Sequence, residues 1–281
     1  MNKKIAVHIS FFQVRKYSQN HDKIINLSKI IKNYLKISKN LDIYIHSNKA
    51  ITLKSNKFIF KRIYNLKNQH PFYLSWKFRK EMEKQKNSYD FFIYTEDDIL
   101  FTKKNFEYWK KYKDQCLSNK FNLGFVRVED NKSKGLYLVD IFHSLYKYIF
   151  IKDNKYFIND VNPYCAFWIY DKIEFQNFLN TKIWKFNWKK NYQTFGDIRA
   201  MAAMGMHGIN MPQYKKTIIP ANKYNNIDPG SVIYHLENKY SITDHGPGSL
   251  KLKNLIKLKT KHSNFLDKVK IIFIKILKKL N

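Results

Sequence analysis

Apolar residues in the first 120 positions alternate between short continuous runs and longer stretches with helical spacing. Residues 5–12 form an apolar run of the length of a buried strand, and residues 21–37 repeat apolar side chains at the period of an amphipathic helix. The same patterns predict strands at 41–46, 57–64 and 89–94, and helices at 71–85 and 103–117. This alternation indicates the α/β fold class with a mostly parallel sheet.

The second half of the chain is less regular, and it contains no internal repeat. Its apolar runs predict strands at residues 122–128, 135–142, 147–158, 164–170, 217–219 and 232–235, and helices at 172–179 and 197–207. We therefore expect a regular first half up to about residue 120, followed by a half with shorter strands.

Three adjacent carboxylates follow the apolar run 89–94: Glu96, Asp97 and Asp98. Apolar residues resume directly after them, so these charges repel one another at the end of a buried strand unless a cation neutralises them. Open α/β sheets bind ligands at the carboxyl ends of their strands. Hard divalent ions take carboxylate oxygens and are often shared with phosphates. The pattern favours a metal–diphosphate site; the alternative is a solvent-exposed acidic turn that caps the following helix.

The segment 94–99, with the sequence Tyr-Thr-Glu-Asp-Asp-Ile, resembles the DxD-type motif of GT-A-fold glycosyltransferases. The order of elements is similar too, with a β/α half of roughly 95 residues, then the motif, then an irregular half. The resemblance implies a GT-A-like, Rossmann-type fold with a mixed central sheet over residues 1–250. A nucleotide-binding half would cover about 1–120 and an acceptor half 121–250. It also implies a nucleotide-sugar donor whose diphosphate is bridged by Mn²⁺ or Mg²⁺, which stabilises the leaving group.

The same resemblance assigns roles within the acidic motif. It makes Asp98 the metal ligand, and it places Glu96 and Asp97 against the ribose, a metal-bound water or the donor sugar. Many such enzymes supply a late histidine to the metal, which makes His235 the second ligand. His245, in a turn of flexible composition, is the alternative ligand. A histidine on a strand also fits an ordinary hydrogen-bonded core position.

Asp197 is the candidate catalytic base. Inverting members of the resembled family place an acid at the start of a helix in the acceptor half, and a helix is predicted just after Gly196. Such a base must lie within hydrogen-bond reach of the acceptor hydroxyl. The structural alternative is a helix N-cap, where Asp is favoured. Glu237 and Asp160 are weaker candidates for the same role.

The nucleotide of the resembled fold lies beyond the first two strands. The residues at these positions, which we expect to bind the donor, are Ser10, Phe11, Arg15 and Asn48.

The charge of the chain limits its partners. Its 281 residues carry 52 Lys and Arg against 22 Asp and Glu, a formal net charge of +30. This charge suits nucleic acid, an anionic membrane or phosphorylated small molecules; an AT-rich codon bias toward Lys is the alternative origin. A content of 44% hydrophobic and 17% aromatic residues excludes a disordered chain. Two Cys exclude a disulfide scaffold and a thiolate zinc site.

Lysine is concentrated at the C-terminus, where residues 251–281 hold ten Lys and one acid. Residues 264–280 carry a continuous apolar stripe with lysines largely off it. This pattern predicts a basic amphipathic helix that lies on an anionic membrane surface; packing against the chain's own core is the alternative. Without a spanning segment or signal peptide, we expect a cytoplasmic protein, peripheral on the inner membrane face. It would extend a glycan or lipid-linked acceptor in surface polysaccharide or lipopolysaccharide biosynthesis.

Other function classes fit the sequence less well. A nucleic-acid-binding protein or metal-dependent nuclease accounts for the charge, but no helix-turn-helix, zinc finger or RNP-like strand is evident, so no nucleic acid is expected. A nucleotidyltransferase needs a Gly-rich loop after the first strand, and residues 10–15 contain no Gly. A non-catalytic scaffold would be insensitive to loss of Asp98.

Overall fold

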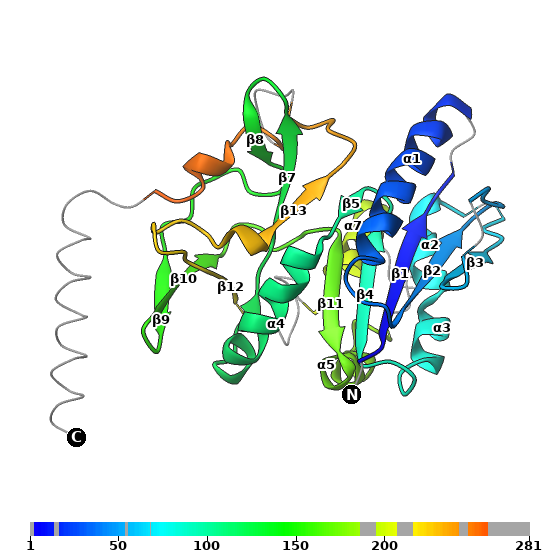
Figure 1. The fold of residues 1–281 in the computed structure, drawn as a ribbon, viewed down its shortest axis with the longest axis horizontal. Coiled ribbons are helices and arrows are strands. Elements are labelled where there is room, and N and C mark those ends of the chain that lie inside the picture. The colour runs from blue at the N-terminus through cyan, green and yellow to red at the C-terminus, as the bar shows by residue number, and fades with distance from the viewer. Residues whose placement is uncertain are drawn as a thin grey trace, which may run out of the picture.

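The computed structural model describes residues 3–13, 17–53, 56–67, 69–185, 195–206, 216–241 and 247–257. Figure 1 shows two parts side by side, a larger sheet flanked by helices and a part built of smaller sheets. The predictions for Arg15, His245 and the helix at 264–280 lie outside the described residues. Within those residues, no helix combines the length and the apolar character needed to cross a bilayer.

The larger sheet has five strands in the order β11-β4-β1-β2-β3. Their bounds are β1 (Ile5–Phe11), β2 (Leu41–Ser47), β3 (Ile59–Ile63), β4 (Phe91–Glu96) and β11 (Phe167–Asp171). The first four strands run parallel and β11 pairs antiparallel with β4, so the sheet is mixed. The predicted α/β class and the predicted strands of the first half are confirmed to within a few residues.

Helices cover both faces of this sheet, because successive side chains of its strands point to opposite sides. The helices are α1 (Tyr17–Tyr34), α2 (Leu74–Lys77), α3 (Arg79–Lys84), α4 (Lys103–Ser118), α5 (Lys172–Leu179) and α7 (Phe195–Met204), with a 3₁₀ turn η1 (Pro71–Tyr73). Ile5, Val7 and Ile9 of β1 share a core cluster with α1 and α4. Ala6 lies in the cluster formed with α3 and α5 on the other face.

Two smaller sheets form the second part of the molecule. One has the order β6-β12-β10-β9, with β6 (Asn122–Leu123), β9 (Tyr148–Ile151), β10 (Asn154–Asn159) and β12 (Thr217–Pro220). The other has the order β5-β13-β7-β8, with β5 (Ile99–Leu100), β7 (Val126–Asn131), β8 (Gly135–Leu138) and β13 (Val232–His235). The 3₁₀ turns η2 (Pro229–Ser231) and η3 (Leu252–Asn254) flank the second sheet, and Leu255 is buried in its core.

The predicted helix at 71–85 is interrupted. The chain instead forms η1, α2 and α3, and it leaves helical geometry at Phe78, with φ −94° and ψ 1°. The Phe78 ring is fully buried and stacks on His46, with ring centroids 3.8 Å apart. We attribute the break to this core contact, which the local apolar spacing does not reveal.

The predicted strand at 122–128 is divided at Gly124. Its first part, β6, pairs with β12, and its second part, β7, pairs with β13 in the other sheet. A Cβ atom at position 124 would lie 2.6 Å from Thr217 Cγ2 and 2.9 Å from Ile219 Cγ1. Only glycine therefore lets the chain pass close to β12 as it changes sheets.

Two other predicted strands are shorter than expected. The run 147–158 is a hairpin of β9 and β10 that turns at Lys152, whose φ is +55°. The run 135–142 ends at Leu138. Beyond it, the Val139 amide donates to the Arg127 carbonyl oxygen at 2.9 Å, and Asp140 accepts two hydrogen bonds from the Arg127 guanidinium, at 2.8 and 2.7 Å, so side-chain contacts replace the strand pairing.

An acidic cluster surrounds Lys113 at the sheet edge opposite to the carboxyl end of β4. The Lys113 ammonium group contacts Asp171, lies 2.9 Å from Asp114 and lies 3.7 Å from Glu174. Burial raises the pKa of Glu174 to about 7; Lys113 opposes this shift, and the charge of Asp171 adds to it. One lysine therefore does not stabilise all three ionised carboxylates.

We predict that Glu174→Gln stabilises the protein at pH 8. A carboxyl with a raised folded-state pKa contributes most to the free energy of unfolding below its unfolded pKa of about 4.3. This contribution is lost as the pH rises through the folded-state pKa of about 7. Glutamine keeps an oxygen for the amide of Asp171 but carries no charge. We expect a gain of roughly 1–3 kcal/mol at pH 8, shrinking toward zero at pH 4.5, measured by urea unfolding.

Glu83, an exposed acid on α3 outside this cluster, provides the control for this prediction, and Glu83→Gln is expected to leave the pH profile of stability unchanged. Identical pH profiles for Glu174→Gln and the unmodified protein would contradict the assignment of a raised pKa.

Candidate metal centre at the end of β4

The acidic motif lies where the two parts of the molecule meet. Glu96 ends β4, and Asp97 and Asp98 form the turn into β5. β5 pairs antiparallel with β13, which sets Ile99 opposite His235, and the Leu236 amide donates to the Asp98 carbonyl oxygen at 2.8 Å. This pairing brings the motif to a strand more than 130 residues later in the chain.

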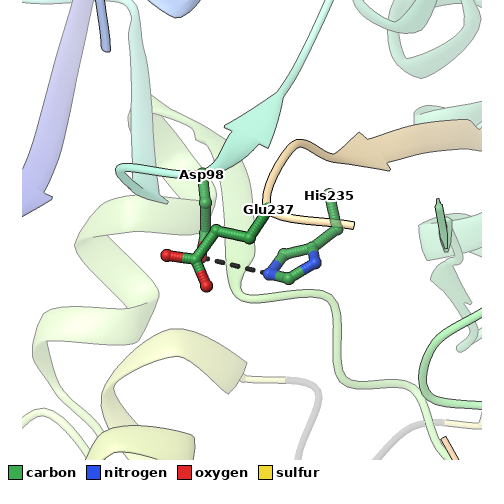
Figure 2. Close-up of side chains that lie close together, drawn as sticks. All are labelled: Asp98, His235 and Glu237. Atoms are coloured by element: carbon green, nitrogen blue, oxygen red, sulfur yellow. Dashed lines mark hydrogen bonds and ion pairs between the residues drawn. The ribbon is translucent and has the colours of Figure 1, made fainter. Parts of the chain in front are cut away.

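Three side chains converge at this junction: Asp98, His235 and Glu237 (Figure 2). One ligand atom from each lies within 4.8 Å of the other two, and His235 Nε2 is 3.1 Å from Asp98 Oδ2. The chain turns at Asn238, which has a φ of +50°, a conformation that Asn tolerates better than most residues. This turn follows Glu237 and keeps it beside the end of β13.

Glu129 fixes the orientation of His235. It lies on β7, next to β13, and is fully buried. Its carboxylate accepts a hydrogen bond from His235 Nδ1 at 2.5 Å, and others from the backbone amides of Tyr240 and Ser241 at 2.7 and 2.6 Å. A carboxylate on one ring nitrogen is the usual support of a metal-binding histidine. Nε2 is thereby directed toward Asp98.

The carboxylates of Asp98 and Glu129 favour the protonated form of His235, which lies between them. Burial alone would lower the pKa of His235, but its hydrogen bonds to Asp98 and Glu129 outweigh burial and raise that pKa to about 9. Burial would raise the pKa of Asp98, but the hydrogen bond and charge of His235, with the charge of Arg127, hold it below the ordinary value. Without a metal, the imidazolium bridges the two carboxylates.

The Asp98–His235–Glu237 group can hold a metal ion. Asp98 Oδ1 is buried and has no hydrogen-bond partner within the described part of the chain. A buried, unpaired carboxylate oxygen is costly, so it is rare unless a ligand or ion satisfies it. The two carboxylates and the imidazole nitrogen are a donor set that divalent metals accept. The residues present therefore fit such an ion.

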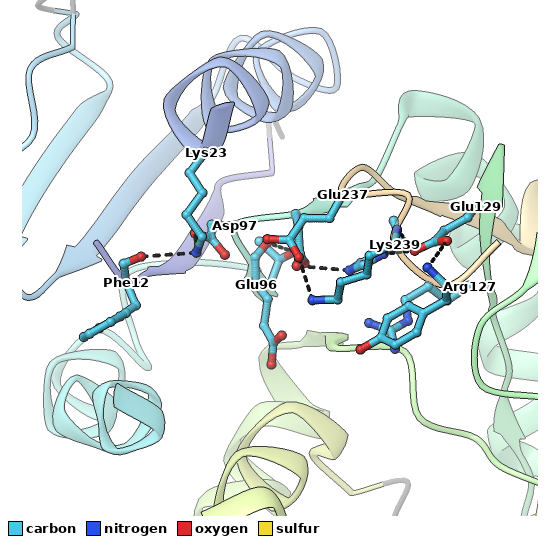
Figure 3. A network of polar contacts seen from close by, with 12 residues as sticks. Phe12, Lys23, Glu96, Asp97, Arg127, Glu129, Glu237 and Lys239 are labelled. Carbon is cyan, nitrogen blue, oxygen red and sulfur yellow. Dashed lines mark hydrogen bonds and ion pairs between the residues drawn. The ribbon is translucent and has the colours of Figure 1, made fainter. Parts of the chain in front are cut away.

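Asp97 has a different environment from the one predicted. It is buried, and its Oδ2 accepts from the Lys23 ammonium group at 2.8 Å, which also donates to the carbonyl oxygen of Phe12 at 3.1 Å (Figure 3). Burial raises the pKa of Asp97, and Lys23 opposes this shift. The carboxylate that we expected on the donor instead forms an ion pair that ties α1 to the acidic turn.

The predicted donor-binding residues after β1 and β2 make internal contacts. The Phe11 ring is fully buried in the core, and the predicted role of Phe11 in donor binding stays a prediction. Ser10 Oγ lies 3.4 Å from Ser75 Oγ. The Asn48 side chain accepts from the Gln13 amide at 2.8 Å and donates to the Gln13 carbonyl oxygen at 3.1 Å. Asn48 thereby joins the two loops.

Glu96 lies at the carboxyl edge of the sheet, beside Ser10 in the register of β1 and β4. It is half-buried, and Tyr164 Oη donates to its Oε1 at 3.4 Å. Of the three acids of the motif, only Asp98 joins the three-residue group, and the predicted contact of Glu96 with the donor stays a prediction.

Asp197 lies in the first turn of α7, since this helix begins at Phe195 and not after Gly196. α7 packs against η1, β11 and β4, on the side of the larger sheet that carries α2. The side chain of Asp197 lies outside the described atoms, so its role as base stays a prediction. The alternative base Asp160 is ion-paired with Lys147 at 2.6 Å.

The sequence does not indicate that Glu129 and Glu237 belong to a metal centre. Glu237 was considered only as a base, although its spacing of two from His235 at a strand end was the signal for a shared site. Glu129 directly follows the predicted strand 122–128, and a single acid at such a position has no distinctive pattern. Its importance follows from the pairing of β7 with β13.

A cleft opens beside the three-residue group, between α1 and the turn after β13. Its volume is about 620 Å³, and Lys23, Glu237 and Lys239 line it. The Lys239 ammonium group lies 2.6 Å from Glu237 Oε2. Glu237 therefore belongs both to the candidate metal centre and to the cleft wall, and two lysines flank it.

No protein-family model matches the chain, and no curated protein matches it. A fold class alone does not determine a function, so the function is argued from the chemistry of the site.

Proposed function

We propose that this protein is a metal-dependent glycosyltransferase with a GT-A-like fold, which moves a sugar from a nucleotide-sugar donor to a glycan or lipid-linked acceptor. The observation that carries the proposal is the Asp98–His235–Glu237 group at the carboxyl edge of the parallel strands. Ligands bind at this edge in open α/β sheets. The order of a β/α half, the acidic motif and an irregular half supports the same assignment.

Of the two ions that the resemblance implies, Mn²⁺ suits this donor set better than Mg²⁺, because it accepts both carboxylate oxygens and an imidazole nitrogen, whereas Mg²⁺ prefers oxygen alone. Asp98, His235 and Glu237 would hold it, and Glu129 would keep His235 Nε2 turned toward it. When bound, the ion supplies Lewis-acid stabilisation of the diphosphate leaving group.

The cleft beside Glu237 supports a nucleotide-sugar as the donor. Its volume of about 620 Å³ lies within the usual range for small-molecule sites. Lys23 and Lys239 enter it from facing walls, from α1 and from the turn after β13. Each now neutralises a carboxylate, Asp97 or Glu237, and an ammonium group with three N–H donors can bind a phosphate oxygen as well.

Asp197 is the proposed base that takes the proton of the acceptor hydroxyl, and the start of α7 is where the resemblance implies it. The basic, apolar segment 264–280 would keep the protein on the inner face of an anionic membrane, close to a lipid-linked acceptor. Together these features favour a role in surface polysaccharide or lipopolysaccharide biosynthesis.

A thermal-shift screen tests this function. We expect one of UDP-, GDP-, CMP- or dTDP-sugars to raise the melting temperature with Mn²⁺ present, and to do so much less without it. A ligand at 100 times its Kd stabilises a protein by about 2.7 kcal/mol. This gain corresponds to a shift of several degrees for a chain of this size.

The matched control is Asp98→Asn, in which the metal-dependent part of the shift is expected to vanish. If no nucleotide-sugar gives a shift that depends on Mn²⁺, the transferase proposal fails. If the protein instead cleaves DNA or RNA with Mn²⁺, and this cleavage needs Asp98, the nuclease alternative replaces it.

A further inference from the structure

A second cavity lies on the other side of β13, away from the candidate metal centre. It has a volume of about 450 Å³, within the usual range for a ligand site, and it is bounded by β8, by the loop before η2 and by residues 251–256. Its apolar lining consists of Leu136, Ile227, Val232, Leu252, Leu255 and Ile256. We call this cavity the β8 groove.

The wall formed by residues 251–256 is held in place by hydrogen bonds on both sides. The Leu138 amide donates to the carbonyl oxygen of Leu250 at 2.8 Å, and the Leu145 amide donates to that of Leu255 at 2.6 Å. Ser144 Oγ donates to the carbonyl oxygen of Asn254 at 2.8 Å. The groove is therefore part of the folded chain and does not need a ligand to form it.

The rim of the groove is positively charged. Lys134, Lys251 and Lys253 line it, and no acidic residue does. Within the described part of the chain, none of the three lysines forms an ion pair, in contrast to Lys23 and Lys239 at the metal centre. An apolar groove with an uncompensated cationic rim has the chemistry of a site for an anionic amphiphile.

We propose that the β8 groove binds a lipid with an anionic phosphate head group, with its hydrocarbon chain on the apolar lining and its phosphate on the lysines. The positive charge of the rim makes two other occupants of the groove unfavourable. A second copy carries a net charge of +30, and the chain's own residues 258–281 hold seven lysines and one acid, so either would bring more positive charge to a positive rim.

The β8 groove and the candidate metal centre lie at opposite ends of β13. β13 begins at Val232 in the groove wall and ends at His235, a distance of about 10 Å at the usual rise of a strand. The proposal that the groove binds a lipid does not depend on the proposed glycosyltransferase activity. The further assignment of this lipid as the carrier of the acceptor rests on the proposed function.

Calorimetric titration of the full chain with monododecyl phosphate, below its critical micelle concentration, tests the groove. We expect saturable binding to the unmodified protein, weakened about tenfold or more in the double variant Lys251→Gln/Lys253→Gln. Dodecyl maltoside, which shares the chain but not the charge, and inorganic phosphate, which lacks the chain, are both expected to bind far more weakly.

Two matched double variants control for non-specific charge: Lys36→Gln/Lys39→Gln near the end of α1, and Lys278→Gln/Lys279→Gln in the C-terminal segment. Both are expected to bind monododecyl phosphate within about twofold of the unmodified protein. No binding to the unmodified protein, equal binding by Lys251→Gln/Lys253→Gln, or loss confined to Lys278→Gln/Lys279→Gln would overturn the proposal.

The two proposals fail separately. Asp98→Asn is expected to bind monododecyl phosphate normally, because Asp98 does not line the groove. Lys251→Gln/Lys253→Gln is expected to keep its Mn²⁺-dependent shift with a nucleotide-sugar, since neither lysine lines the cleft beside Glu237. A groove variant that also loses the nucleotide response would mark a general folding defect and would overturn the assignment of these lysines to the lipid.

Discussion

The Asp98→Asn variant is expected to lose Mn²⁺ affinity by at least about 100-fold, and to retain no measurable glycosyl transfer. Even a group that only supports a metal ligand is worth about 10–100-fold in affinity, and Asp98 is itself a proposed ligand. Asparagine keeps one oxygen but removes the charge that faces His235 Nε2 at 3.1 Å. Titration with Mn²⁺, followed by electron paramagnetic resonance of the free ion, measures the affinity directly.

Asp130→Asn is the matched control, since Asp130 is an exposed carboxylate on β7, next to Glu129 in the chain. Its Mn²⁺ affinity is expected to equal that of the unmodified protein. Unchanged Mn²⁺ binding by Asp98→Asn would remove the metal centre from this site, and with it the main support for the transferase.

Glu129→Gln is expected to lower the free energy of unfolding at pH 7 by about 3–5 kcal/mol, the usual cost of breaking a buried charge pair from one side. The carboxylate accepts hydrogen bonds from His235 and from the amides of residues 239–241. An amide cannot replace both oxygens, because its NH₂ group would face backbone N–H donors. Urea unfolding of the metal-free protein gives the loss without reference to any activity.

The pH dependence follows from the same contacts. Burial would raise the pKa of Glu129, but the hydrogen bonds from His235 and the backbone lower it below the ordinary value. A carboxyl with a lowered folded-state pKa stabilises the protein above its unfolded pKa of about 4.3, and this contribution is lost as the pH falls further. The cost of Glu129→Gln should therefore be full at pH 7 and smaller in acid.

Glu83→Gln, an exposed change on α3, provides the control and is expected to shift stability by less than about 0.5 kcal/mol. If Glu129→Gln is as stable as Glu83→Gln at pH 7, then Glu129 does not anchor His235 and the 239–241 segment as the contacts indicate.

Most strands and helices of the first half follow from the amino-acid sequence alone. Apolar runs and helical spacing located the parallel strands of the larger sheet and the helices α1, α4 and α5, because these patterns reflect which side chains face the core. The strand that leads into Glu96, Asp97 and Asp98 was equally evident from the sequence, since three adjacent charges after an apolar run have few stable environments.

How these elements pack against one another is visible only in the folded chain. Pairing of β5 with β13 brings His235 to Asp98, and pairing of β13 with β7 brings Glu129 to His235, across 137 and 106 positions of the chain. The packing of α1 against the acidic turn also pairs Asp97 with Lys23. Hydrophobic periodicity specifies the face of an element but not its partner, so contacts between distant segments are fixed only when the strands pair and the core closes.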